Sequence, residues 1–390
     1  MLTRRTLLRV PVFSYFLPFG RPASGATRRA LLVGINEYVA AGQSSSDEEP
    51  AAGAHATASA KIQRSGFNNL DGAVNDAKLM NELLKVRFGF SSSNVVFLRD
   101  RQATRSRILQ EFQKHLIDAA AAGDVSLFYY AGHGSQVKNL ASEEADQLDE
   151  TLVPADALAG ARDIRDKEMA SLYRAAAKKG ILLTVVLDSC HSGGMSRGVW
   201  NQSGKTRYVP PDPRPVSDPD RDPATGKKPP DAASMGVLFL KAAREDQPSR
   251  ETVIIERGAN GVATEVKHGA FTAALARVFQ SPMADQSVEQ ICERVQAMLA
   301  SEGQVQVPIC AGRNRARLGL LGQPAGLGAS IAVPVLDTSN EGRIRLRGGY
   351  ALGLATGCTL IRTSGQPVRL ELTRVESWRS VQARYLGGAS

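Results

Sequence analysis

Residues 181–194 read Ile-Leu-Leu-Thr-Val-Val-Leu followed by Asp-Ser-Cys-His-Ser-Gly-Gly. The first seven residues form the most apolar strand-length run in the chain, which is typical of a strand buried on both faces of a parallel sheet. Cys190 comes directly after this run and before a pair of glycines. In open α/β sheets, functional residues gather just beyond the carboxyl ends of the strands, so this position makes Cys190 a candidate functional residue.

Segments of similar apolar character recur along the chain on both sides of this run. We expect further strands over residues 29–35, 94–98, 124–131 and 237–242. Between the strands, apolar residues repeat at helical spacing, which predicts helices over 73–88, 104–122, 166–179, 269–279 and 287–299. Strands that alternate with helices of this length indicate a mostly parallel sheet with helices on both faces. The expected fold class is therefore α/β.

A second strand end carries a reactive side chain between glycines. Residues 130–135 read Tyr-Ala-Gly-His-Gly-Ser, which places His133 just after the strand expected over 124–131. Neighbouring parallel strands lie ~4.8 Å apart, so the groups at adjacent ends can converge. A cysteine thiolate attacks a carbonyl carbon, and a histidine manages the proton and protonates the leaving amine. We therefore predict that His133 and Cys190 are the catalytic pair of a cysteine hydrolase.

The backbone around this pair predicts an oxyanion hole. Flanking glycines allow N–H groups to point into the gap, and we expect those of Gly134 and Cys190 to bind the developing oxyanion. A buried structural cysteine and a core histidine would be the ordinary interpretation of either residue alone, but the glycine-flanked strand ends favour catalysis. His191 competes with His133 for the role of the base; adjacent side chains usually point apart, so we favour His133.

The two glycine-flanked motifs resemble those of the metacaspase branch of the caspase-like cysteine peptidases, in a form typical of bacteria. Four further stretches match in the same order, at residues 70–77, 149–156, 242–247 and 269–272. The resemblance covers about residues 28–322 and implies a caspase–haemoglobinase fold, a large and a small subunit portion, and a Cys–His dyad. The chain departs from animal caspases, which carry Gln-Ala-Cys where this sequence has Asp188-Ser189-Cys190.

Two acids are expected to bind the substrate. Asp188 lies two residues before Cys190, and Asp76 lies in the first turn of an expected helix. In metacaspases the matching acids form the pocket for a basic residue before the scissile bond, so the resemblance implies cleavage after Arg or Lys. Two carboxylates can hold a guanidinium by charge-assisted hydrogen bonds. The alternative for Asp76 is an ordinary first-turn acid that interacts with the helix dipole.

No cofactor is required for Cys–His chemistry, but the resemblance raises the question of calcium. Many metacaspases bind calcium through acids beyond the dyad histidine, and the candidates in this chain are Asp149, Asp166 and Glu168. Lys167 stands where the family usually has a second aspartate, and Arg197 stands where another acid is common. Hard cations require several oxygen ligands, which a lysine opposes. Calcium is therefore a possible cofactor that the sequence neither requires nor excludes.

The first residues of the chain have the composition of an export signal. Residues 1–26 combine paired arginines, a short apolar core and a small-residue exit, and the paired arginines resemble a twin-arginine signal. The protein is therefore expected to be exported to the periplasm or secreted. The alternative is a disordered basic leader that follows from a misplaced start codon.

The rest of the chain is expected to form two folded parts. Residues 27–322 make up the peptidase domain, with a large part over 27–200 and a small part over 234–322. Residues 201–233, between them, contain eight of the nineteen prolines, so we expect an exposed connector without regular structure. Short alternating apolar runs and many glycines predict a small all-β module over residues 330–390.

The overall composition excludes several classes of protein. At 390 residues with 43% hydrophobic and 22% charged residues, the chain is typical of a soluble globular protein, with no apolar run long enough to span a bilayer. Its four cysteines are too few and too scattered for a disulfide scaffold, and they lack the spacing of a structural zinc site. The net charge of +9 is concentrated at the two ends, so no nucleic-acid partner is expected. We expect a monomer acting on protein or peptide substrates that contain basic residues.

The connector itself contains basic residues that such an enzyme would recognise. Because connector and active site share one chain, their effective concentration is high, and we expect self-cleavage there. The candidate sites are Arg197, Lys205, Arg207, Arg221, Lys227 and Lys228; Arg214 is excluded because Pro215 follows it.

Three other functions are open to the same sequence. An inactive caspase-like scaffold would be expected to lack His133 or Cys190, and both are present. A basic binding protein would use the β module, in which three arginines alternate and share one strand face: Arg343, Arg345 and Arg347. A serine hydrolase built on Ser135 or Ser189 lacks the Gly-x-Ser-x-Gly turn that such enzymes use.

Overall fold

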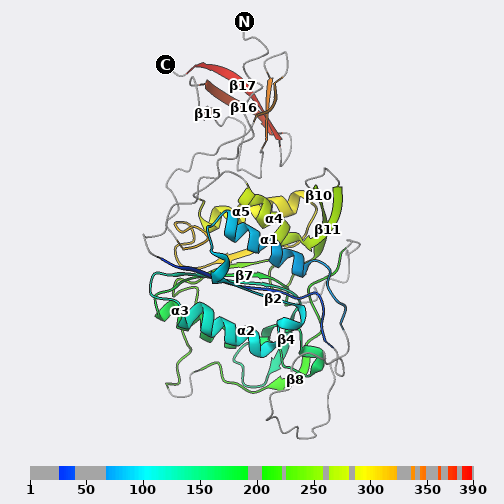
Figure 1. Cartoon of the computed structure of the whole chain (residues 1–390), viewed down its shortest axis with the longest axis vertical. Coiled ribbons are helices and arrows are strands. Elements are labelled where there is room, and N and C mark those ends of the chain that lie inside the picture. Colours follow the sequence, from blue (N-terminus) through cyan, green and yellow to red (C-terminus); the bar gives the residue numbers. More distant parts are fainter. Residues whose placement is uncertain are drawn as a thin grey trace.

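A six-stranded sheet forms the centre of the molecule (Figure 1). The computed structural model describes residues 26–39, 67–191, 204–221, 225–257, 263–280, 286–322, 335–338, 343–347, 359–361, 368–375 and 380–388. In spatial order the central strands are β12 (Ile309–Ala311), β9 (Leu238–Lys241), β7 (Leu182–Asp188), β3 (Val125–Ala131), β1 (Arg28–Gly34) and β2 (Val95–Arg99). Neighbouring strands run parallel except β12, which is antiparallel to β9. The expected parallel sheet is confirmed.

Helices cover both faces of this sheet, as the alternation of elements predicts (Figure 1). One face carries α1 (Ala73–Val86), α4 (Ala270–Gln280) and α5 (Val288–Ser301). The other carries α2 (Arg105–Glu111), its π-helical continuation η3 (Phe112–Asp118) and α3 (Asp166–Lys178). Because successive strand residues point to opposite faces, Tyr129 packs in the first layer and Phe128 in the second. Single turns of 3₁₀ helix lie at η1 (Ser92–Asn94), η2 (Asp100–Gln102) and η4 (Ala157–Ala159).

The helix starts follow from short polar caps in the sequence. The Thr104 hydroxyl accepts a hydrogen bond from the Arg107 N–H at 3.3 Å and begins α2. Ser287 and Gln290 cap each other's backbone N–H groups at the start of α5. These contacts satisfy N–H groups that have no partner within the helix.

Two small sheets beside the central one were not indicated by the sequence pattern. The four-stranded sheet has the order β6 (Ile164–Arg165), β5 (Leu148–Leu152), β4 (Gly134–Asn139) and β8 (Asp212–Val216). The two-stranded sheet pairs β10 (Glu251–Arg257) with β11 (Ala263–Gly269). These strands are short or carry charged residues, so their sequences lack the long apolar runs of buried strands.

The connector corrects one expectation from the sequence. We expected residues 201–233 to be exposed and without regular structure, but β8 lies within this segment and pairs in parallel with β4. Pro213 and Pro215 are tolerated because β8 is an edge strand, whose outer side needs no hydrogen-bond donors. Nearby, Arg207 is fully buried rather than exposed. Arg197 and the rest of 192–203 lie outside the described residues, as do 222–224.

The C-terminal strands form a separate antiparallel sheet, as expected from the alternating sequence pattern. Its order is β13 (Val335–Thr338), β14 (Arg343–Arg347), β17 (Ser380–Gly388), β16 (Val368–Val375) and β15 (Thr359–Ile361). Arg343, Arg345 and Arg347 take alternate positions along β14. The fold class is thus α/β with additional small antiparallel sheets.

One disulfide, between Cys292 of α5 and Cys310 of β12, was not identified from the sequence. Their Cα atoms lie 6.2 Å apart, within the usual range for a disulfide. Cys190 is a free thiol, and Cys358 lies outside the described residues, as do residues 1–25 of the expected export signal.

Within the described ranges, no helix has both the length and the apolar character needed to cross a membrane.

Candidate active site

The ends of β3 and β7 bring His133 and Cys190 to the same edge of the central sheet. The strands are parallel neighbours, and Ala131 at the end of one lies opposite Asp188 at the end of the other. Gly134 allows the two ends to approach closely, because a Cβ atom there would lie 2.2 Å from the Cys190 carbonyl oxygen. The glycine after the histidine is therefore required by the contact between the two chain segments.

The imidazole of His133 is buried and held in one orientation. Its Nε2 lies 2.7 Å from the carbonyl oxygen of Asn68, and its ring packs against the rings of Tyr38 and Phe67 at centroid distances of 5.0 and 5.8 Å. The Tyr38 hydroxyl accepts a hydrogen bond from the His133 backbone N–H at 2.8 Å. A carbonyl oxygen can only accept a hydrogen bond, so Nε2 is the donor in this contact, and in a neutral ring Nδ1 is then the basic nitrogen.

The thiol of Cys190 is also buried, with 2% of the residue exposed. Burial raises the pKa of this thiol to about 12, because an apolar environment disfavours the thiolate. Its Sγ lies 3.9 Å from the carbonyl oxygen of Ser249, the residue before β10 in sequence order. In this arrangement the thiol is therefore largely protonated.

A residue of the connector occupies the space between the two strand ends. The carbonyl oxygen of Arg207 accepts hydrogen bonds from the N–H of Gly134 at 2.9 Å and from the N–H of Cys190 at 3.3 Å. These are the two groups that the sequence led us to expect in an oxyanion hole. Because the second donor belongs to Cys190 itself, its thiol and the Arg207 carbonyl lie in the same small site.

The guanidinium of Arg207 lies among three buried carboxylates. Its Nη2 is 2.5 Å from an Asp76 oxygen and 3.4 Å from a Glu251 oxygen, and its Nη1 is 3.2 Å from an Asp188 oxygen. All four side chains are at most 2% exposed. Burial by itself would lower the pKa of Arg207, but the three carboxylates outweigh it and raise the pKa well above its usual value. The structure thus brings the two expected acids together and adds a third.

Residues just before β10, at the end of β11 and in the first turn of α4 complete this pocket and were not identified as site residues from the sequence. Ser249 and Thr272 donate hydrogen bonds to Asp188, and His268 and the Gly269 N–H contact Asp76. Gly269 lines the pocket closely, since a Cβ atom there would lie 2.2 Å from an Asp188 oxygen. Burial raises the pKa of Asp76, and the Arg207 guanidinium opposes that rise. The acids are therefore held in place by many donors.

The order and content of these elements agree with a known family. A family model described as the caspase domain matches residues 27–318, most of the chain.

The chain belongs to the caspase-domain family.

The family comprises cysteine peptidases, and this chain resembles metacaspases among its members. It is 33% identical over 177 residues to metacaspase-1A of Aspergillus oryzae, which covers 44% of this chain and 36% of that protein. It is 35% identical over 133 residues to metacaspase-1 of Schizosaccharomyces pombe, covering 33% of this chain and 31% of that protein. The matches thus span about a third of these relatives' length.

Among solved structures, protein GSU0716 from Geobacter sulfurreducens superposes on this caspase domain with a TM-score of 0.49 and 21% identity. That superposition covers 76% of this chain and 97% of the other. The structure of pro-sf-caspase-1 superposes with a TM-score of 0.38 and 12% identity, covering 78% and 94%.

His191, the alternative candidate for the base, lies in different surroundings from His133. Its Nε2 is 3.7 Å from a carboxylate oxygen of Glu150, a residue of β5. Burial lowers the pKa of His191, which keeps the ring neutral. Ser135, the alternative nucleophile, donates from its hydroxyl to the carbonyl oxygens of Val209 and Pro210, both at 3.0 Å. The adjacent histidine and this serine thus have other partners in the fold.

The three candidate calcium ligands, Asp149, Asp166 and Glu168, are already paired with cationic groups or hydrogen-bond donors. The Lys167 ammonium lies 2.5 Å from one Asp149 oxygen, also contacts Asp220, and lies 3.3 Å from the Ser142 hydroxyl. Arg165 contacts the second Asp149 oxygen at 3.3 Å. This arrangement does not fit a calcium ion, because the Lys167 ammonium group lies between the buried carboxylates of Asp149 and Asp220. No group of three or more acidic, histidine or cysteine side chains in the described part of the chain is arranged to hold a metal.

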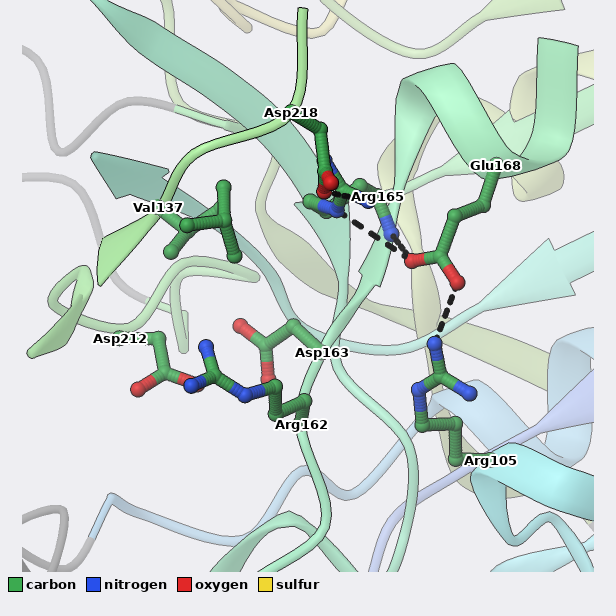
Figure 2. A pocket seen from close by; sticks show the side chains of 9 residues that line it. Arg105, Val137, Arg162, Asp163, Arg165, Glu168, Asp212 and Asp218 are labelled. Carbon is green, nitrogen blue, oxygen red and sulfur yellow. Dashed lines mark hydrogen bonds and ion pairs between the residues drawn. The ribbon is translucent and has the colours of Figure 1, made fainter. Parts of the chain in front are cut away.

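Glu168 and Asp166 likewise have partners other than a metal. Figure 2 shows Glu168 between Arg105 and Arg165, with Arg165 also contacting Asp218 of the connector, at 2.6 Å. These residues line a pocket of about 240 Å³ that does not include His133 or Cys190. An Asp166 oxygen accepts the Lys167 backbone N–H at 2.7 Å.

Proposed function

We propose that this protein is a cysteine endopeptidase that cleaves after arginine or lysine, with Cys190 as nucleophile and His133 as the proton carrier. One observation supports this assignment above all others. The side chain of Arg207 lies in the three-carboxylate pocket while its carbonyl oxygen accepts the N–H groups of Gly134 and Cys190. A substrate residue directly before a scissile bond would need both of these contacts at once.

The reaction follows from the groups around that carbonyl. The Cys190 sulfur attacks the carbonyl carbon as its proton passes to Nδ1 of His133, and the oxygen becomes an oxyanion bound by the two N–H groups. The C–N bond then breaks, and His133 protonates the departing amine. Water hydrolyses the remaining thioester, which regenerates the thiol and releases a carboxylate.

The pocket explains the preference for a basic side chain. A guanidinium brought into a fully buried site needs opposite charge and hydrogen-bond acceptors, and Asp76, Asp188 and Glu251 supply both. An acidic side chain would meet three carboxylates and be repelled. Arginine should be favoured over lysine, because its planar fork of donors can contact several acids at once.

We further propose that the first substrate is the chain itself, cut between Arg207 and Tyr208. The expectation of self-cleavage rested on an exposed connector, whereas Arg207 is buried. The proposal of self-cleavage is now supported by the position of Arg207 beside Cys190, and no longer by exposure of the connector. The flanking backbone is extended and paired on both sides, since the Arg207 N–H donates to Ser249 and the Val209 N–H donates to Gly134.

Mass spectrometry of purified protein tests both proposals. We expect the wild type to yield a fragment with Tyr208 at its new N-terminus, while Cys190→Ala and Arg207→Ala remain intact at this bond. Arg214→Ala is the matched control, because Arg214 lies in the same segment but is bound to Asp212 and is followed by Pro215. A Tyr208 terminus in Cys190→Ala, or none in an active wild type, would contradict self-cleavage here.

For the localisation, we propose that the protein is exported. The signal-like residues 1–26 support it, and so does the Cys292–Cys310 disulfide, since disulfides persist mainly in oxidising compartments. Fractionation of cells that express the full chain, with detection of the processed N-terminus, tests this. An inactive scaffold is not favoured, because the dyad residues, the pocket acids and the oxyanion donors are all present.

A further inference from the structure

A second basic residue of the connector lies in its own acidic site. Lys205 precedes Arg207 by two residues, and its ammonium lies 2.8 Å from an Asp71 oxygen and 2.7 Å from the Asn69 carbonyl oxygen. Asp71 comes just before α1, which carries Asp76 in its first turn. Neither Asp71 nor Asn69 was singled out by the sequence.

The backbone geometry explains why these two side chains share one side of the segment. The Glu251 N–H donates to the Lys205 carbonyl at 2.9 Å, the Arg207 N–H donates to the Ser249 carbonyl at 2.9 Å, and Thr206 forms an antiparallel bridge with Arg250. In an extended strand, side chains two residues apart point the same way and the one between points away. In any substrate held in this manner, the side chain of the third residue before the cleaved bond would lie beside Asp71.

The two acidic sites are physically joined. The carboxylate of Glu251, which contacts Arg207, also accepts the backbone N–H groups of Asp71 and Gly72 at 2.7 to 3.2 Å. Asp71 is therefore fixed relative to the main pocket. Hydrogen bonds from Lys205 and Lys267 lower the pKa of Asp71, so it is ionised under ordinary conditions.

We propose that Asp71, with the Asn69 carbonyl, forms a second basic subsite. The inference rests on the proposed function and deepens it, because it defines the substrate class. Preferred substrates carry Lys or Arg, then any residue, then Arg, and they are cut after the last of these. Lys267 holds the other Asp71 oxygen at 2.8 Å and competes with the substrate for this charge.

The expected size of the effect follows from exposure. Asp71 and Lys205 are 34% and 40% exposed, so water screens their attraction. Exposed ion pairs of this kind change affinity by about three- to fivefold. The first pocket, which is fully buried, should dominate, and the second should refine the choice among arginine-containing substrates.

Three fluorogenic peptide amides test the subsite on the processed enzyme: Lys-Thr-Arg, Ala-Thr-Arg and Glu-Thr-Arg. We expect kcat/KM of the wild type to be about three- to fivefold higher for the lysine peptide than for the alanine peptide, and lowest for the glutamate peptide. Asp71→Asn should bring the lysine-to-alanine ratio close to one, and Lys267→Ala should increase it. Glu82→Gln, an exposed acid elsewhere on α1, should leave the ratio as it is.

The outcomes separate this subsite from the proposed function. Equal cleavage of all three peptides by the wild type, or an unchanged ratio in Asp71→Asn, would overturn the subsite and leave cleavage after arginine intact. No cleavage of any peptide would overturn the proposed function and the subsite with it. The wild-type comparison needs no variant to fold, so it decides the matter even where Asp71→Asn is poorly produced.

Discussion

The N–H of Gly134 donates a 2.9 Å hydrogen bond to the carbonyl oxygen of Arg207, which joins the turn after β3 to the connector. The Cys190 N–H reaches the same oxygen at 3.3 Å. The two N–H groups proposed to bind a substrate carbonyl are therefore occupied by a segment of the chain itself. The properties of the Cys190 thiol should depend on that segment.

Release of the connector should expose the thiol. In a His133→Ala background, where self-cleavage is blocked, we expect adding Arg207→Glu to raise the rate of Cys190 alkylation at least about tenfold. The glutamate would be repelled by the three pocket acids, and a released thiol would lose the burial that raises its pKa to about 12. Iodoacetamide labelling followed by peptide mass spectrometry measures this rate.

The control for that comparison is His133→Ala with Arg214→Glu. It makes the same charge change in the connector but outside the pocket, where Arg214 pairs with Asp212. Equal labelling rates in all three proteins would show that the connector does not protect the thiol.

Removal of either dyad residue should abolish turnover without unfolding the protein. We expect Cys190→Ala and His133→Ala to lower kcat/KM for an arginine peptide by at least about 10³-fold, since both act on the reacting atoms. His191→Gln should remain active, because that ring faces Glu150. Kinetics and circular dichroism of the three variants test this, and near-normal activity of Cys190→Ala would refute the assigned nucleophile.

Neutralising one pocket acid should cost substrate recognition more than stability. Asp188→Asn removes a fully buried charge that contacts the bound guanidinium, so kcat/KM for arginine peptides should fall by about 100-fold or more. Asp118→Asn, which changes an exposed acid on η3, should have no effect. A peptide library scored on wild type and both variants gives the result; a preference for acidic residues in the wild type would contradict the assigned pocket.

Lys167 should make this protein independent of calcium. Its ammonium neutralises Asp149 and Asp220, whose side chains are 0% and 2% exposed, so chelators should leave wild-type peptidase activity unchanged. Lys167→Met should lower the free energy of unfolding by about 2–4 kcal/mol, and calcium should raise the Tm of this variant only. Lys178→Met, on the exposed side of the same helix, is the control. Loss of wild-type activity on chelation would contradict this role.

The same ion pair should lose its effect in acid. Burial alone would raise the pKa of Asp220, but hydrogen bonds from Lys167 and the Glu143 N–H hold it below its usual value. A carboxylate with a lowered folded-state pKa stabilises the fold above its unfolded pKa of about 3.9, and this contribution disappears as the pH falls through the folded value. Urea unfolding at pH 7 and pH 3 should therefore show a smaller difference between wild type and Lys167→Met at the lower pH.

Local pattern was sufficient for the five parallel strands of the central sheet and for the positions of the candidate dyad, but not for the short antiparallel edge strand β12. The buried strands are continuous apolar runs, and in the helices apolar residues repeat at helical spacing. Each of these signals can be recognised from residues that are close together in the sequence. Parallel strands end at one edge of a sheet, so the positions of His133 and Cys190 after β3 and β7 followed from the order of elements. The matched motifs added Asp76 and Asp188, which the structure brings to one guanidinium.

Only the tertiary structure decided what completes and occupies the pocket. Glu251, Ser249 and His268 come from a hairpin region far along the chain, and β8 depends on pairing with β4 rather than on its own proline-rich sequence. The burial of Arg207 could not be expected from composition, because a connector rich in prolines and charges is ordinarily solvated. A buried guanidinium is stable only where distant carboxylates converge on it, and that convergence is a property of the folded chain.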